Sequence, residues 1–181
     1  MNDFFKHPEI KYEHLMGAPF IFGTNDCYEL GRKVFAENTP IQLPPYARPN
    51  DFWLGVEDLY LNNFQREGFV QIDVPLNELQ PLDVFLIAMP DNRQTSSRTI
   101  TNHCAIYVGG NKVIHHYLNR ASECVTYKGW VRQFTTHVIR HRDVPRLQPK
   151  SEDFDVMQMI PRHKRVKLME ALYGPQEERN D

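Results

Sequence analysis

The 181-residue sequence contains no long uninterrupted run of apolar residues. Charged side chains recur through the first fifteen positions, where a secretion signal would stand, among them Asp3, Lys6 and Glu9. A signal peptide needs an apolar stretch of about 7 to 15 residues, and a membrane-spanning helix needs about 20. We therefore expect no membrane span. We also expect the protein to be made and folded in a cytoplasm and to reach any extracellular site by another route.

The sequence also lacks an excess of charge of either sign. Lysine and arginine number 21, aspartate and glutamate number 23, and the formal net charge is -2. The basic residues are scattered except near the C-terminus, so the sequence indicates no basic surface that could follow a phosphate backbone. We expect no nucleic-acid partner.

Cysteine is scarce, and the three cysteines are Cys27, Cys104 and Cys124. An odd number of cysteines without close spacing argues against a disulfide framework and against a zinc ribbon, because both need paired thiols. Each thiol therefore needs its own explanation. We interpret Cys104 and Cys124 as core or surface thiols.

The hydrophobic pattern divides the chain into a helical part and a strand-forming part. Helical spacing predicts one helix over residues 27–37 and a second that begins at residue 52 and continues up to Gly68. Short β-rich runs follow, and Gly109 and Gly110 mark a hairpin between two of them. The predicted strands are residues 69–74, 83–89, 103–108, 112–118 and 137–142. Helices followed by an antiparallel sheet predict an α+β domain.

The composition, with 41% hydrophobic and 24% charged residues, is that of one ordinary domain. Residues 1–16 are predicted as an N-terminal arm, residues 17–145 as the domain, and residues 146–181 as a polar linker and a basic helix. The pattern of that helix, over residues 161–172, fits two interpretations equally well. It either packs on the surface of the domain or is a docking element for a partner.

Cys27 stands at the start of the first predicted helix. Asp26 and Glu29 have the spacing of a capping box, which makes Cys27 the first helical residue. Unpaired backbone N–H groups and the positive end of the helix dipole favour thiolate over thiol at this position, and they can stabilise an oxyanion. A lone cysteine is more often a buried core residue, but the neighbouring glycine, asparagine and aspartate favour an exposed turn. Cys27 is therefore the candidate nucleophile.

His103 is the candidate general base, because a thiolate needs a group that takes and returns its proton near neutral pH. It opens a predicted strand after a polar loop at residues 91–101, where a rigid side chain can still reach solvent. His115 and His116 lie across the predicted hairpin, so either could bond the far nitrogen of His103 and orient it. A two-residue turn favours His116, whereas a bulge or a three-residue loop favours His115.

Zinc binding is the alternative use of these side chains, since cysteine and histidine are zinc ligands. Neighbouring residues of a strand point to opposite faces, so at most one of His103 and Cys104 is expected to face Cys27. The sequence offers no carboxylate or spaced pair that would complete a zinc site. We expect neither a metal ion nor an organic cofactor.

These motifs resemble, in the same order, those of the NlpC-type cell-wall cysteine peptidases. The resemblance covers about residues 17–142. Asp26 and Cys27 are similar to the nucleophile turn of that family, and residues 103–109 are similar to its histidine strand. The resemblance implies a compact papain-like fold, with N-terminal helices packed on an antiparallel sheet.

The resemblance also implies which residues carry the chemistry. Cys27 is expected to be the nucleophile and His103 the base. His115 is expected to orient the base, because it stands at the third catalytic position of the family, twelve residues beyond His103. The family spacing thus selects His115 over His116.

Three positions depart from the family pattern. Tyr28 stands where the family usually has a serine that helps to bind the free amine of a stem peptide. Phe20 stands where many members have tyrosine, and Leu82 replaces a glycine. On this resemblance Asp26 and Tyr28 are the candidate substrate-binding residues.

Within the family, the likeness is strongest to a subgroup from phage tail tips. It rests on residues 26–30, on the proline-rich loop at residues 43–49 and on the histidine doublet. The resemblance implies an endopeptidase that cuts an amide of a peptidoglycan stem peptide, is carried to the cell wall by the virion, and has other tail-tip proteins as partners. The alternative is a structural tail-tip protein on the same fold whose site is silent.

Overall fold

The computed structural model describes residues 10–49, 51–55, 57–91 and 100–144. The predicted linker and basic helix lie outside these ranges, as does most of the predicted polar loop. Within the described ranges, no helix is both long enough and apolar enough to cross a membrane.

Six strands form one antiparallel sheet in the spatial order β1-β6-β2-β3-β4-β5. The prediction of an α+β domain with an antiparallel sheet is confirmed. The sequence pattern does not predict β5, because this edge strand is short and partly polar, as suits an unpaired edge. The strands are β1 (Phe69–Ile72), β2 (Val84–Ile87), β3 (His103–Gly109), β4 (Lys112–His115), β5 (Glu123–Thr126) and β6 (Thr135–His141).

The first predicted helix forms as α1 (Cys27–Asn38), with Asp26 as its N-cap. The second prediction, one continuous helix from residue 52 up to Gly68, is wrong. The structure has a 3-10 turn at Phe52–Leu54 and a separate helix, α2 (Leu59–Asn63). Asp58 separates them, because its buried side chain accepts a hydrogen bond from the backbone N–H of Leu61 and so caps a new helix.

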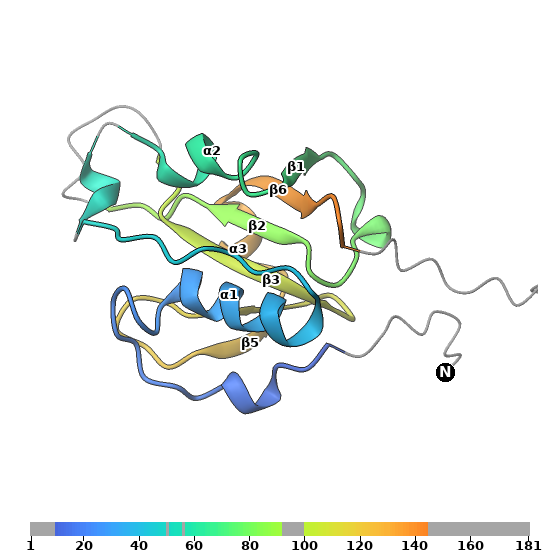
Figure 1. Cartoon of the computed structure of the whole chain (residues 1–181). Coiled ribbons are helices and arrows are strands. Elements are labelled where there is room, and N and C mark those ends of the chain that lie inside the picture. The colour runs from blue at the N-terminus through green and yellow to red at the C-terminus, as the bar shows by residue number, and fades with distance from the viewer. Residues whose placement is uncertain (1–9, 50, 56, 92–99, 145–181) are drawn as a thin grey trace, which may run out of the picture. The chain divides into compact units, whose positions relative to one another are not determined.

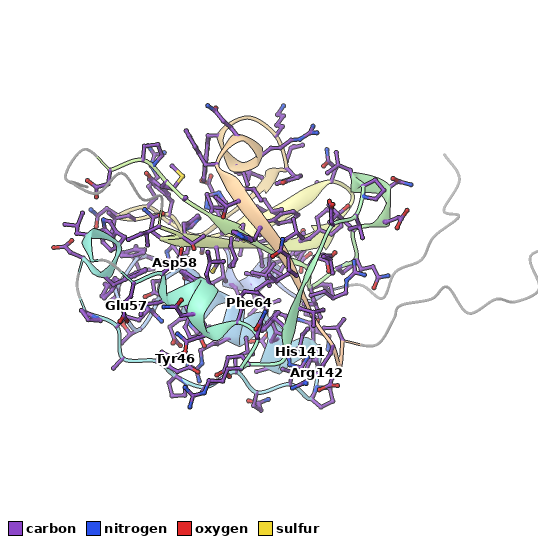
Figure 2. All side chains as sticks on the ribbon, turned by 90° about the horizontal axis from the view of Figure 1, so that it is seen from above. Tyr46, Glu57, Asp58, Phe64, His141 and Arg142 are labelled. Atoms are coloured by element: carbon purple, nitrogen blue, oxygen red, sulfur yellow. The ribbon has the colours of Figure 1, made fainter. Side chains whose placement is uncertain are left out.

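Helices cover both faces of the sheet. Leu30, Val34 and Phe35 of α1 are buried against one face, and side chains of α2 pack against the same cluster. On the other face, Val131 of the short α3 (Trp130–Gln133) is buried with Phe85 of β2. Figures 1 and 2 show α1 and α2 on one side of the sheet and α3 on the other. Short 3-10 turns at Glu13–Leu15 and Leu76–Glu78 complete the described elements.

The hairpin between β3 and β4 combines a tight turn with a bulge. Gly109 pairs with Lys112, which leaves Gly110 and Asn111 as a two-residue turn, each with a φ of 58°. Positive φ at both positions is what a type I′ hairpin turn requires. The register then shifts between Tyr107 and Gly109. This extra residue in β3 reverses the parity that the turn alone would give.

The bulge decides which histidine of the doublet shares a face with His103. Ala105 pairs with His115, and residues two apart in a strand point to the same face. His103 and His115 therefore lie on one face of the sheet, and His116 lies on the other.

A left-handed turn leads into β2. Leu82 has a φ of 76° and is buried in the core. A side chain in this conformation costs about 1 to 2 kcal/mol, and burial of a leucine side chain, worth about 1.5 to 3 kcal/mol, offsets that cost. The turn places the buried Asp83 beside Arg140 of β6. Nε and Nη2 of Arg140 lie 2.6 and 2.8 Å from the carboxylate oxygens of Asp83. This ion pair ties β2 to β6.

The described part of the predicted N-terminal arm, residues 10–16, packs on the domain. Ile10 is buried in the cluster that α1 forms with the sheet, and Leu15 packs against that cluster. The hydroxyl of Ser122 donates to the carbonyl of Leu15 and accepts from the backbone N–H of Ala18. The chain that approaches α1 is therefore held in place.

Substitution of Gly68 should separate a steric clash from backbone strain. Gly68 precedes β1 with a φ of 89°, and an added Cβ would lie 2.6 Å from Nε2 of His141. Gly110 also has positive φ, but the space beside it is open. We predict that Gly68→Ala lowers the free energy of unfolding by about 2 to 4 kcal/mol, through strain and overpacking. Gly110→Ala should cost about 1 kcal/mol. Urea unfolding measures both changes, and equal losses would contradict the clash.

Candidate active site

Asp26 holds the turn that presents the candidate nucleophile. Its carboxylate accepts hydrogen bonds from the backbone N–H groups of Tyr28 at 3.0 Å, Glu29 at 3.1 Å and Gly23 at 2.7 Å. Its fourth partner is the guanidinium of Arg48. Asp26 is only 2% exposed. The carboxylate is therefore engaged by the protein itself, and it makes Cys27 the first residue of α1.

Arg48 and Tyr28 fasten the proline-rich loop to α1. The guanidinium of Arg48 lies 4.8 Å from the centre of the Tyr28 ring, and the Tyr28 hydroxyl donates to the carbonyl of Pro44 at 2.9 Å. Tyr28 also lines an apolar pocket between the helices and the sheet. The structure thus places Tyr28 among internal contacts of the loop.

Cys27 and His103 line the same cleft. Aromatic rings and polar side chains both contribute to its walls. Within the described ranges, no group of three histidine, cysteine, aspartate or glutamate side chains is arranged to hold a metal ion. The other residues that line the cleft include Phe20, Phe22, Asp26, Arg48, Phe52, Trp53, Tyr60, Asn102, His116 and Tyr117.

The surroundings of Cys27 favour its thiolate. The pKa of Cys27 is lowered well below its usual value, first by a hydrogen bond with Cys104 and next by the hydrogen bond and charge of His103. These effects outweigh burial, which raises the pKa. The hydroxyl of Tyr60 also lies 3.4 Å from Sγ. The pKa of Cys104 is raised well above its usual value, by its bond to Cys27 and by burial. Cys27 is therefore the first of the two thiols to lose its proton.

The position of Cys104 corrects the sequence analysis. We expected at most one of His103 and Cys104 to face Cys27, but both interact with its thiol. His103 is the first residue of β3, so its side chain can reach past the end of the strand to the face that Cys104 occupies. Cys104 is a buried core residue, as expected, but one that also contacts the nucleophile. Cys124 is half-buried, and its Sγ lies 3.7 Å from the hydroxyl of Tyr12.

His115 contacts His103 from the neighbouring strand. The two ring centres lie 5.3 Å apart and the ring planes are nearly perpendicular. Trp130 of α3 lies near both rings, with centre distances of 6.2 and 5.2 Å. Burial, followed by the charge of His103, lowers the pKa of His115 to about 3. His115 is therefore neutral near pH 7 and has one nitrogen that donates and one that accepts.

Glu123 of β5 is a neighbour of His115 that the sequence did not indicate. The two residues are paired across β4 and β5, and Oε1 of Glu123 lies 3.5 Å from Nε2 of His115. Both nitrogens of His115, and Nε2 of His103, are buried without a hydrogen bond among the described residues. A proton on Nε2 of His115 would point toward Glu123 and would leave its Nδ1 free to accept.

His116 lies on the face of the sheet opposite to His115, and it also lines the cleft. Its Nε2 lies 3.1 Å from the carbonyl of Arg120, and its ring meets the ring of Phe20 edge to face at 5.4 Å. Burial lowers the pKa of His116. One ring nitrogen is thus held by the backbone.

Asp58 ties α2 to the start of β3. Its carboxylate is 1% exposed and accepts from the backbone N–H of Thr101 at 2.7 Å, from the Thr101 hydroxyl, and from the backbone N–H of Leu61 at 3.0 Å. Thr101 stands two residues before His103, and Figure 2 shows Asp58 at the start of the helix that carries Tyr60. The bond therefore fixes Tyr60 relative to His103. No local sequence signal indicates this contact, because its partners are 43 residues apart.

Two phage proteins are similar to this chain. The tail tip assembly protein K of Escherichia phage lambda is 33% identical over 129 residues, which cover 71% of this chain and 60% of that protein. The tail tip assembly protein K of Escherichia phage N15 is 27% identical over 135 residues, which cover 72% of this chain and 50% of that protein. The matched region thus spans between half and three fifths of the relatives' length.

Two solved structures of NlpC/P60-type proteins also match. One, from Staphylococcus aureus and described as similar to a lipoprotein, is 20% identical with a TM-score of 0.44, over 70% of this chain and 37% of that one. The other, from Bacillus cereus, is 19% identical with a TM-score of 0.46, over 71% of this chain and 37% of that one. The profile of the NlpC/P60 family matches residues 17–140. The chain belongs to the NlpC/P60 family.

Proposed function

We propose that this protein is a cysteine endopeptidase of a phage tail tip, and that it cuts amide bonds in the peptide stems of peptidoglycan. The observation that carries the proposal is the position of Cys27. It is the first residue of α1, it shares a cleft with His103, and its pKa is lowered well below the usual value. Membership of the NlpC/P60 family and the likeness to two phage tail tip proteins support the proposal.

The first half of the proposed reaction forms a thioester. The thiolate of Cys27 attacks the carbonyl carbon of the amide, and the negative charge moves to the carbonyl oxygen. The N–H groups of Tyr28 and Glu29 already donate to Asp26, so we assign the backbone N–H of Cys27 as the donor to this oxyanion. Protonated His103 gives its proton to the amine nitrogen as the carbon–nitrogen bond breaks.

The second half restores the enzyme. A water molecule attacks the thioester carbon while His103 accepts its proton. The carbon–sulfur bond then breaks, the carboxylic acid product leaves, and Cys27 returns to the thiolate. One group thus acts as acid in the first half and as base in the second.

His115 is proposed to orient His103. Nε2 of His103 and Nδ1 of His115 are both buried without a hydrogen bond among the described residues, and the rings are in contact. A hydrogen bond from the first nitrogen to the second would satisfy both. It would also leave the other nitrogen of His103 facing Cys27. Catalytic hydrogen bonds are often loose in a free enzyme and tighten when substrate binds.

Asp26 and Tyr28 are proposed to affect substrate binding through the shape of the nucleophile turn. The internal bonds of Asp26 fix Cys27 and Arg48 at the cleft. Tyr28 holds the loop that carries Arg48. Loss of either side chain is expected to change the walls of the cleft.

The proposed setting is the virion. The protein would be made in the host cytoplasm, would join other tail-tip proteins, and would act in the periplasm or cell wall when the tail meets the envelope. The likeness to two tail tip assembly proteins supports this setting.

Digestion of purified peptidoglycan tests the proposed activity. The full chain should release peptide-bearing fragments and new amino termini, both measured by liquid chromatography and mass spectrometry. Cys27→Ala should release neither, because the nucleophile is lost. Cys124→Ala is the matched control, since this thiol is half-buried on β5, and it should remain active. Absence of release by the folded wild-type protein would instead support a structural tail-tip protein with a silent site.

The two histidines of the doublet should differ in their effects. His115→Ala should lower single-turnover cleavage by roughly 10- to 1000-fold, the usual worth of a positioned acid–base group. His116→Ala should mainly lower stability, because Nε2 of His116 is bonded to the carbonyl of Arg120. Thermal melts and rates of the two variants give the comparison. A normal rate for His115→Ala with a large loss for His116→Ala would refute the assignment.

A further inference from the structure

The hydroxyl of Tyr60 lies between two sulfur atoms of the active site. Its oxygen is 3.4 Å from Sγ of Cys27 and 3.6 Å from Sγ of Cys104. The proposed reaction assigns this hydroxyl no part, although it contacts the nucleophile directly. Sequence spacing indicated only that Tyr60 belongs to a helix.

Tyr60 is a phenol whose pKa lies well above its usual value. Burial raises its pKa well above the usual value, and negative charge on a neighbouring cysteine sulfur raises it further. A protonated phenol is a hydrogen-bond donor. The group that lies beside the two sulfurs is therefore a hydrogen-bond donor near neutral pH.

With both thiols protonated, the Tyr60 hydroxyl can donate to Cys104, and at Cys27 either atom could be the donor. Once Cys27 is a thiolate its sulfur can only accept, so the single proton of the hydroxyl is expected to go to Cys27. The pKa values of the two thiols move apart, so that Cys27 becomes the thiolate while Cys104 stays neutral. A hydrogen bond to an ionised acceptor is roughly twice as strong as one to a neutral acceptor. Ionisation of Cys27 thus draws the proton of Tyr60 to its sulfur.

The ring of Tyr60 is held in place from several sides. Its centre lies 6.4 Å from that of Tyr28 and 6.3 Å from that of Phe52. Asp58 fixes the start of its helix to Thr101, close to the candidate base. The hydroxyl therefore has a defined position before substrate arrives.

We propose that Tyr60 is a positioning residue of the active site, whose hydroxyl donates a hydrogen bond to the Cys27 thiolate and holds the sulfur in line with the substrate carbonyl. This inference rests on the proposed function, because it takes Cys27 as the nucleophile. The donor role itself can be measured without any substrate.

The test is the pH dependence of Cys27 alkylation by iodoacetamide in the full chain, followed by peptide mass spectrometry. Tyr60→Phe keeps the ring and removes the donor. The free energy of a typical hydrogen bond to a charged group corresponds to a pKa change of about one to two units. The apparent pKa of Cys27 should therefore rise by about one to two units in this variant.

Tyr12→Phe is the matched control. Tyr12 also places its hydroxyl beside a thiol, 3.7 Å from Sγ of Cys124, and Cys124 is absent from the lining of the cleft. Like Tyr60→Phe, this variant removes the hydroxyl oxygen of a tyrosine that lies beside a cysteine. The apparent pKa of Cys27 should not change in Tyr12→Phe.

An unchanged pKa of Cys27 in folded Tyr60→Phe would overturn the inference. If that variant does not fold, 3-fluorotyrosine incorporated at position 60 keeps the ring and makes the hydroxyl a stronger donor. The pKa of Cys27 should then fall, and a constant value would overturn the inference. A shift in Tyr60→Phe without peptidoglycan cleavage by the wild-type protein would support the donor role while contradicting the proposed function.

Discussion

The buried carboxylate of Asp26 is the contact on which the site depends. It caps α1 through two backbone N–H groups, holds Gly23 through a third and pairs with Arg48. Burial of an ionised carboxylate is tolerated only when hydrogen bonds and opposite charge compensate it. The turn, the helix start and the proline-rich loop must therefore form together. Their joint formation places Cys27 at the positive end of α1, where a thiolate is favoured.

Long-range contacts then bring the other groups to this thiol. A bulge in β3 aligns His115 with His103, and the bond from Thr101 to Asp58 sets α2 against the start of that strand. Each contact joins elements that are far apart in the chain. The fold thus brings side chains of α1, α2, β3 and β4 together around one cleft.

Local signals explain why much of this was predictable. The cap at Asp26 and the helix after it depend on neighbouring residues, and five of the strands are marked by β-rich runs between turn residues. The histidine pairing was not fixed by local signals, because a Gly-Gly-Asn turn permits registers of either parity, and only the family spacing favoured His115. No sequence pattern indicated the contacts of Tyr60 and Glu123, because each depends on a partner in another element.

The central claim is that the fold activates one thiol of three. Competitive labelling of the native protein with iodoacetamide at pH 7 tests it most directly, because alkylation requires the thiolate and needs no knowledge of the substrate. Cys27 should react about tenfold faster or more than Cys104 and Cys124, since a thiol of ordinary pKa is only a few per cent ionised at this pH. Equal or slower labelling of Cys27 in the folded protein would contradict the account.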